Sequence, residues 1–180
     1  ELYWLFRYGA KLCASGLASV IDLCSPGPLA KQRKRCLNHA LKSDLEVHEA
    51  CIEDTTAWSE YWNVLTEVLQ SRHGVNPVHS LDEITLLAKR FPDHIRLKVV
   101  RYPASRQIIA GTILFLSSPV VHVQYIASTS EGRGIGALDL LFVSLCKEYS
   151  RLEGFNEGLN RQKEGFGARS VVYQAFEMEL

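Results

Sequence analysis

The sequence lacks several features that would assign its class at once. Its 20 Lys and Arg residues are balanced by 20 Asp and Glu residues, so the formal net charge is zero. A neutral chain has no overall attraction to nucleic acid or to an anionic membrane surface. The apolar runs are far shorter than the roughly 20 residues that a membrane-spanning helix needs. The sequence shows no signal peptide and no initial methionine, so we expect no membrane segment and an incomplete N-terminus.

The cysteines follow no disulfide or metal-binding pattern. There are five, an odd number, and they are widely spaced, without a Cys-x-x-Cys pair or a Cys/His spacing typical of a metal site. Such usage is typical of a reducing compartment. We therefore expect a cytoplasmic protein that holds no metal. The cysteines are Cys13, Cys24, Cys36, Cys51 and Cys146.

What the sequence does contain is typical of an ordinary globular domain. A chain of 180 residues, 47% of them apolar, can form a core without disulfides or metals. We predict a single domain over 1–180. Within it, 1–53 form an N-terminal portion, and 54–180 form the core that carries the functional site.

Apolar periodicity predicts the order of the helices and strands. Residues 2–24 are interpreted as two short strands around Gly9 or Gly16, before a Pro/Gly break at 25–29. The connections within 95–128 are too short for parallel crossovers, so we predict an antiparallel meander there. Helices are predicted at 29–42, 56–72, 81–91, 137–149 and 156–166, and strands at 47–51, 95–102, 107–116, 120–128 and 170–180.

Two predicted helices begin with side chains of chemical interest. Ser80 and Glu83 have the spacing of a capping box, and His79 lies just before them in the loop that enters helix 81–91. Helix 29–42 carries basic residues around an apolar stripe. We interpret it as a solvated amphipathic helix or, alternatively, as a surface that faces phosphate groups. The basic residues are Lys31, Arg33, Lys34, Arg35 and Lys42.

Residues 129–136, TSEGRGIG, place three glycines just before an apolar helix. The stretch is not a Walker A loop, because no Gly-Lys-Ser/Thr follows, and its G-x-G-x-G spacing is not the dinucleotide-binding fingerprint. A strand, a loop of exposed amides and a helix N-terminus together favour an anion site, to which Arg133 would add charge. The alternative is an ordinary tight turn. We predict a phosphate-binding loop over 130–136.

The same stretch resembles the GNAT superfamily of N-acetyltransferases. Its members carry [Q/R]-x-x-G-x-[G/A] between their fourth strand and third helix, in a loop that binds the pyrophosphate of acetyl-CoA. The glycines of 131–136 match this motif, with Glu131 in place of Gln or Arg, and the predicted element order over 55–180 is similar. The resemblance implies a GNAT-like α/β (α+β) fold with a mixed, mainly antiparallel sheet flanked by helices. It also implies acetyl-CoA or another acyl-CoA as co-substrate.

A narrower resemblance links nearly the whole chain to the Fem-type peptidyltransferases within this fold. It rests on PVHSLDEITLLAKRFP, IIAGTILF, VQYIASTSEGRG, NEGLNRQKEGFGARSVVY and the basic KQRKRCLNHALKS; LNRQKEGFGAR is the most specific part. Members usually have a core strand before the NEGL segment, but here only 150–154 separate that segment from the preceding helix. We favour residues missing from the sequence near 150–155 over a deleted strand.

Acyl transfer from a thioester to an amine needs a base for the amine, a donor for the oxyanion and often an acid for the thiolate. His79 is a candidate base or a structural histidine, and Glu83 is a candidate base or only a cap. Tyr125 and, through the Fem-type motif, Lys163 complete the catalytic candidates, while Tyr173 is a thiolate acid or a packing residue. The GNAT resemblance implies that strand 120–128 diverges from its neighbour and lies along the acyl and pantetheine groups. The predicted acyl-CoA contacts are Gln124, Ile126, Ser128, Gly132, Arg133, Gly134, Ile135, Gly136 and Ala137.

Three functions remain open from the sequence. The first is transfer of an acyl group from acyl-CoA to a small amine, with acceptor choice set partly by 73–80. The second, implied by the Fem-type resemblance, is aminoacyl transfer from aminoacyl-tRNA, with helix 31–42 as the nucleic-acid contact; the zero net charge argues against it. The third is an inactive fold that binds a ligand or partner, which the acidic residue at 131 would favour.

Overall fold

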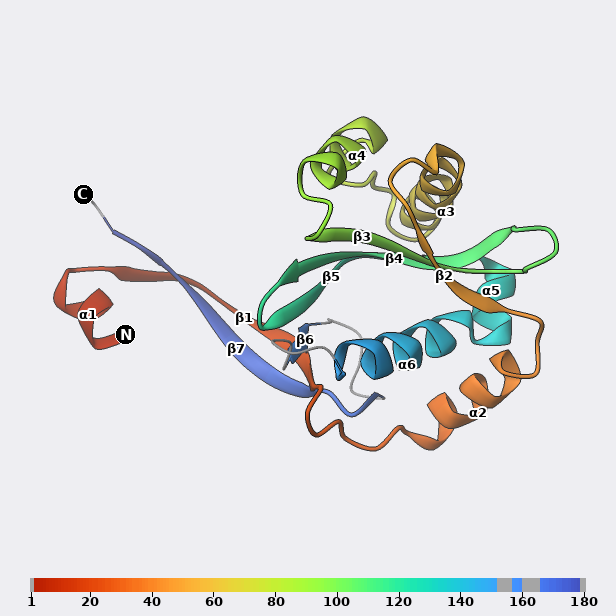
Figure 1. Ribbon diagram of the computed structural model, residues 1–180. Coiled ribbons are helices and arrows are strands. Elements are labelled where there is room, and N and C mark those ends of the chain that lie inside the picture. The colour runs from red at the N-terminus through yellow and green to blue at the C-terminus, as the bar shows by residue number, and fades with distance from the viewer. Residues whose placement is uncertain (1, 152–156, 160–165, 179–180) are drawn as a thin grey trace.

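The computed structural model describes residues 2–151, 157–159 and 166–178. Figure 1 shows a central sheet with α3 and α4 on one face and α2 and α6 on the other. The elements are, in chain order, α1 (Leu2–Arg7), β1 (Lys11–Asp22), α2 (Lys31–Ala40), β2 (Glu46–Ala50), α3 (Thr55–His73), α4 (Leu81–Arg90), β3 (Ile95–Arg101), β4 (Ile108–Ser117), β5 (Val120–Ser128), α5 (Ser130–Ile135), α6 (Ala137–Tyr149), β6 (Glu157–Leu159) and β7 (Arg169–Glu177).

The sheet has seven strands in the order β2-β3-β4-β5-β6-β1-β7. β3, β4 and β5 form the predicted antiparallel meander, and β2 extends it antiparallel to β3. β6 pairs parallel to β5 and antiparallel to β1, and β7 pairs antiparallel to β1. The sequence prediction of a mixed, mainly antiparallel sheet flanked by helices is therefore confirmed.

Each face of the sheet packs against its own apolar core. One core joins α3 and α4 to the sheet through residues such as Trp58 and Ile84, and the other joins α6 to the sheet through residues such as Leu141. β4 lies between the two cores and is buried at nearly every position. This explains why its sequence is apolar at most positions and does not alternate with polar residues, since a strand covered on both faces needs no polar alternation.

Local signals in the sequence fix the two ends of α3 and the start of α4. Asp54 caps α3 by accepting a hydrogen bond from the Ala57 N–H at 3.0 Å, and the helix ends at Gly74 with φ of 64°. That left-handed conformation strains side chains other than glycine, which explains the residue. α4 begins with both hydrogen bonds of the Ser80–Glu83 capping box, so this prediction is also confirmed.

Two predictions of secondary structure outside the glycine-rich stretch were wrong. Residues 2–24 form α1 and one long strand, not two strands: Gly9, at φ of 79°, makes the turn, and Gly16 lies within β1. Aromatic residues favour strands only weakly, and runs this short do not separate helix from strand. Residues 157–159, predicted as helix, form β6, because pairing with β1 and β5 outweighs local helix propensity.

β6 therefore supplies a strand where the sequence suggested that one was missing. The break expected near 150–155 falls largely on 152–156, which are outside the described residues. Lys163 also lies outside them, so the structure places no side chain at that candidate.

Candidate functional site

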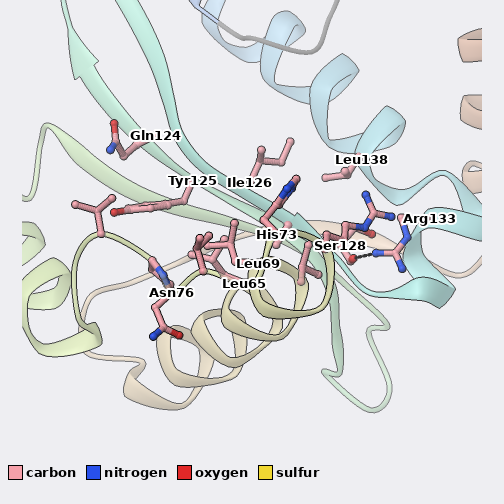
Figure 2. A pocket seen from close by; sticks show the side chains of 16 residues that line it. Leu65, Leu69, His73, Asn76, Gln124, Tyr125, Ile126, Ser128, Arg133 and Leu138 are labelled. Atoms are coloured by element: carbon pink, nitrogen blue, oxygen red, sulfur yellow. Dashed lines mark hydrogen bonds between the residues drawn. The ribbon is translucent and has the colours of Figure 1, made fainter.

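An open cleft of about 540 Å³ lies beside the second half of β5. Figure 2 shows its lining side chains converging from α3, from the segment after α3, from β5 and from the α5–α6 region. Because α3 covers one face of the sheet and α6 the other, the cleft opens at the edge of β5 rather than over one face. Its lining residues are Leu65, Val68, Leu69, Arg72, His73, Val75, Asn76, Pro77, Val78, Gln124, Tyr125, Ile126, Ala127, Ser128, Arg133 and Leu138.

The cleft lies beside the part of β5 that follows its pairing with β6. Their register joins Val120–His122 to Glu157–Leu159 and, in the part of the chain that the structure describes, goes no further. The described residues of β6 end at Leu159, opposite His122, so the divergence that the GNAT resemblance implied stays a prediction. In addition, β5 contains a bulge, because Tyr125 opposes Ile113 while Val123 opposes Leu114. Gln124 is the extra residue, and such bulges redirect the side chains that follow.

The bulge brings two catalytic candidates together. The Tyr125 hydroxyl lies 2.5 Å from Nδ1 of His79, a hydrogen bond between residues 46 positions apart. Tyr125 is only 8% exposed, and its ring meets that of Trp62 edge-on, with centroids 5.4 Å apart. The Tyr125 side chain is thus held rigidly, and its hydroxyl and the imidazole form a pair that can pass a proton.

Glu83 has a structural explanation. Its carboxylate accepts the backbone N–H of Ser80 at 2.7 Å and the Ser80 hydroxyl at 2.9 Å. These two hydrogen bonds, with a smaller contribution from nearby His79, lower the pKa of Glu83 from its ordinary value. The carboxylate is exposed and is not among the residues that line the cleft. A carboxylate whose pKa is lowered in this way is a weaker proton acceptor than an ordinary one.

The predicted phosphate-binding loop over 130–136 was wrong in its conformation, because this stretch forms the short helix α5. Thr129 caps it, accepting the N–H of Gly132 at 3.0 Å. The N–H of Arg133 donates to Thr129 and that of Gly136 donates to Gly132, so these amides are used within the helical turn. The sequence predicted a loop because glycine favours loops. The structure instead places Gly132 and Gly134 in a helical turn that Thr129 caps.

The three glycines of this stretch have different structural roles. A Cβ on Gly132 would press on the carbonyl oxygen of Ile109, and a Cβ on Gly136 would lie 2.6 Å from the carbonyl oxygen of Cys36. Gly136 also has φ of 88°. A Cβ on Gly134, by contrast, would meet no atom within 4 Å. Packing therefore explains Gly132 and Gly136 but leaves Gly134 unexplained.

Two charged residues of α5 are held by neighbouring groups. The Arg133 guanidinium, at the cleft, donates to the carbonyl oxygen of Ser128 at 2.6 Å and to the Ser130 hydroxyl at 2.7 Å. The Glu131 carboxylate accepts the hydroxyl of Tyr102 at 2.8 Å, and this bond raises the pKa of Tyr102. Glu131, the residue that departs from the GNAT motif, is thus hydrogen-bonded to Tyr102 in the connection between β3 and β4.

The cleft contains only part of the predicted acyl-CoA contacts. Gln124, Ile126, Ser128 and Arg133 line it, and the Ser128 hydroxyl is turned away to the carbonyl oxygen of Ile109. The remaining predicted contacts lie beside the cleft but are not part of its lining. They are Gly132, Gly134, Ile135, Gly136 and Ala137.

The sequence interpretation missed the wall that α3 contributes. Leu65, Leu69, Arg72 and His73 line the cleft from its C-terminal half. From the sequence, Arg72, His73 and Gly74 indicate only the end of a helix. No local pattern indicates which face of that helix packs beside β5. With Arg133, these residues give the cleft two arginines and one histidine, and no Asp or Glu stands among its lining residues.

The described residues offer neither a metal site nor a membrane-spanning helix. They contain no group of three or more His, Cys, Asp or Glu side chains that could hold a metal ion. Within the same ranges, no helix has the length and apolarity to cross a membrane.

No protein-family model and no curated protein sequence matches this chain. Among solved structures it is similar to FemX, with a TM-score of 0.72, 11% identity, and coverage of 94% of this chain and 65% of that one. It is also similar to the C-terminal domain of a putative lysylphosphatidylglycerol synthetase from Agrobacterium fabrum, with a TM-score of 0.62, 13% identity, and coverage of 88% and 50%. It is similar as well to an aminoglycoside acetyltransferase from an uncultured soil metagenomic sample, solved with sisomicin. That similarity has a TM-score of 0.52, 13% identity, and coverage of 67% of this chain and 79% of that one.

These similarities establish the fold. The chain has a GNAT-like fold related to that of FemX, as the sequence resemblance predicted. It spans 65% of FemX and 50% of the synthetase chain, so the likeness covers part of each of those proteins.

Proposed function

We propose that this chain is an N-acyltransferase that moves an acyl group from acyl-CoA to a small amine. The cleft beside the second half of β5, with Tyr125 in its wall and His79 hydrogen-bonded to the Tyr125 hydroxyl, is the observation that carries the proposal. Beyond His122, where β5 has no partner on this edge among the described residues, its backbone would offer donors and acceptors to an extended acyl and pantetheine chain. The similarity of the fold to an acetyltransferase supports the same class of reaction.

The reaction joins the amine nitrogen to the thioester carbonyl carbon and then breaks the carbon–sulfur bond. A backbone N–H at this edge of β5 would hold the oxyanion that forms in between. In the tautomer with Nδ1 unprotonated, Tyr125 donates its hydroxyl proton to His79 and accepts the proton that the amine loses. The departing thiolate then takes this proton from the Tyr125–His79 pair, which returns to its starting state, so the products are the amide and the free thiol.

The arginines of the cleft suit the phosphates of such a donor. Arg72, His73 and Arg133 line the cleft together, without a lining carboxylate to repel an anion. Gly134 is the exposed position beside them where a side chain would meet no protein atom. A glycine there leaves room for a phosphate to approach the backbone of α5.

A thermal melt with acetyl-CoA, with desulfo-CoA and with uncharged tRNA tests the donor. A ligand at 100 times its Kd adds about 2.7 kcal/mol of stability, which is a shift of several degrees for a domain of this size. We expect a shift with both CoA compounds, followed by release of free thiol when an amine is added. No shift at millimolar acetyl-CoA would contradict an acyl-CoA donor. A shift without turnover across an amine panel would leave a ligand-binding domain.

Aminoacyl transfer from aminoacyl-tRNA is the second candidate, because the similarity to FemX covers more of this chain, and at a higher TM-score, than that to the acetyltransferase. In α2, Lys31, Lys34 and Arg35 are exposed. Arg33 instead forms a salt bridge, with 3.3 Å between its Nη1 and Oδ1 of Asp139. Exposed cations of this kind could contact phosphates. Binding of tRNA that weakens steeply with salt, and that is lost when these three residues become Gln, would favour this candidate over acyl-CoA.

A further inference from the structure

β1 and β7 form a two-stranded arm that leaves the rest of the sheet. They pair antiparallel from Lys11 opposite Glu177 to Val20 opposite Arg169, whereas β6 pairs with β1 only over Val20–Asp22. Figure 1 shows the arm extending to the left of the helices, with α1 at its far end. Along β1, fully buried positions begin only at Val20 and Ile21.

The arm exposes apolar side chains on both of its faces. Val171 is 38% exposed and Val172 is 60% exposed, and neighbours along a strand point to opposite faces. Leu12 and Leu17 of β1 are more than half exposed, and α1 has no buried residue although it carries Tyr3, Trp4 and Phe6. An isolated two-stranded ribbon is marginally stable at best in water. Apolar surface gathered in this way marks an interaction site.

The outer edge of β7 is suited to pairing with another strand. β7 is the last strand in the order of the sheet, and all nine of its residues are strand over 169–177. Its sequence, RSVVYQAFE, contains no Pro and no Lys, the residues that commonly protect such edges.

We propose that the arm is the interface of a homodimer, in which the β7 edges of two copies pair antiparallel about a two-fold axis at Tyr173. This register places Arg169 opposite the partner's Glu177, and Glu177 opposite the partner's Arg169. Within one chain, Glu177 already lies opposite Lys11. Each Glu177 would then stand between two cationic positions. Moving the register by two residues in either direction loses both Arg–Glu pairs and shortens the ladder.

The same register gives the exposed apolar residues of β7 cross-strand neighbours in the partner. Val171 faces the partner's Ala175, and Val172 faces the partner's Gln174, so the ribbon becomes a four-stranded sheet. Each α1 is carried to the opposite end of the partner's β7, where the partner's arm leaves its domain. No residue of the arm lines the cleft beside β5, so the dimer is independent of the proposed acyl transfer.

Sedimentation equilibrium on the whole chain, with two charge reversals, tests this register. In Arg169→Glu each homodimer contact becomes Glu against Glu, and in Glu177→Arg it becomes Arg against Arg. Each variant alone should dissociate at least about tenfold more readily, because two cross-strand pairs change from attraction to repulsion. A mixture of the two variants should form a heterodimer with the affinity of the original chain, since both pairs are then of opposite charge. Recovery on mixing separates this effect from a folding defect.

A crosslink at the axis gives a second measurement. Cysteines that replace Tyr173 would face each other across the axis at the Cα spacing of a disulfide, whereas cysteines that replace Gln174 would not. We expect a disulfide-linked dimer under mild oxidation for Tyr173→Cys, above the level of Gln174→Cys and of the original chain. A monomer at 100 µM, or a dimer whose affinity ignores both charge reversals, would overturn the proposal.

Discussion

The Tyr125 hydroxyl and Nδ1 of His79 lie 2.5 Å apart, one in the wall of the β5 cleft and the other just before α4. If this pair carries the amine proton, Tyr125→Phe should lower kcat/KM by about 10²- to 10⁴-fold, the usual contribution of acid–base catalysis. His79→Gln should have a similar effect. The double variant should be little worse than either single one, because the two residues act as a unit. Initial rates of thiol release at saturating acetyl-CoA would measure this.

A purely structural hydrogen bond would give a different result. The two substitutions would then lower the melting temperature by an amount worth about 1 kcal/mol and leave kcat/KM nearly unchanged. Circular dichroism melts of the same samples separate the two outcomes.

Gly134 and Gly136 should respond in opposite directions to alanine. Gly134 has open space around it, so Gly134→Ala should stabilise the fold by about 0.5–1 kcal/mol, the usual gain within a helix. Gly136→Ala should destabilise it by about 1–3 kcal/mol, because of its φ of 88° and the Cys36 carbonyl oxygen. Urea titrations would measure both.

The larger variant Gly134→Leu tests ligand contact at the same position. If a phosphate lies there, this variant should keep or raise its melting temperature and lose the shift that acetyl-CoA produces. An undiminished shift would remove Gly134 from the binding site. A distant exposed change, Lys89→Leu on α4, is the matched control for added apolar surface.

Tyr61 should tolerate loss of its hydroxyl. The side chain is fully buried, the hydroxyl has no hydrogen-bond partner among the described residues, and burial raises its pKa. Removing an unsatisfied buried polar atom should therefore leave stability unchanged or raise it by about 1 kcal/mol in Tyr61→Phe. Gly111→Ala should have the opposite effect, because a Cβ there would lie 2.6 Å from the Tyr61 ring. A destabilised Tyr61→Phe would indicate a partner for the hydroxyl, such as bound water.

The free energy of unfolding should depend on pH below about 4.5 in part through Glu83. Its pKa is lower in the folded chain than the ordinary value of 4.5, so its contribution is present above pH 4.5 and is lost as the pH falls through the folded value. Glu83→Ala should therefore melt at a lower temperature than the original chain at pH 7, and the difference should shrink below pH 4. A constant difference from pH 7 to pH 3 would mean that the ionised form of the carboxylate does not provide the stabilisation.

Local patterns predicted those parts of the structure that local interactions determine. The Ser80–Glu83 box and the end of α3 at Gly74 depend on a few adjacent residues, and the meander follows from short connections between apolar strands. The Tyr125–His79 bond could be listed only as two separate candidates, because it depends on how α4 packs against the sheet. The α5 turn and β6 were misread for the same reason: tertiary contacts, with Ile109 and with β1, fix their conformation.

The bulge at Gln124 determines which face of the sheet the side chains in the second half of β5 point to. Before it, Val121 and Val123 pack into the core on the α6 side; after it, Tyr125 and Ala127 pack into the core on the α3 side, although all four positions are odd-numbered. Removing Gln124 would remove the bulge, and strict alternation after Val123 would still leave the tyrosine on the α3 side. A strand that kept Gln124 but paired regularly through it would instead turn Tyr125 toward α6, away from His79. The chemistry proposed for this cleft thus depends on the bulged pairing itself, even with every candidate catalytic residue still encoded.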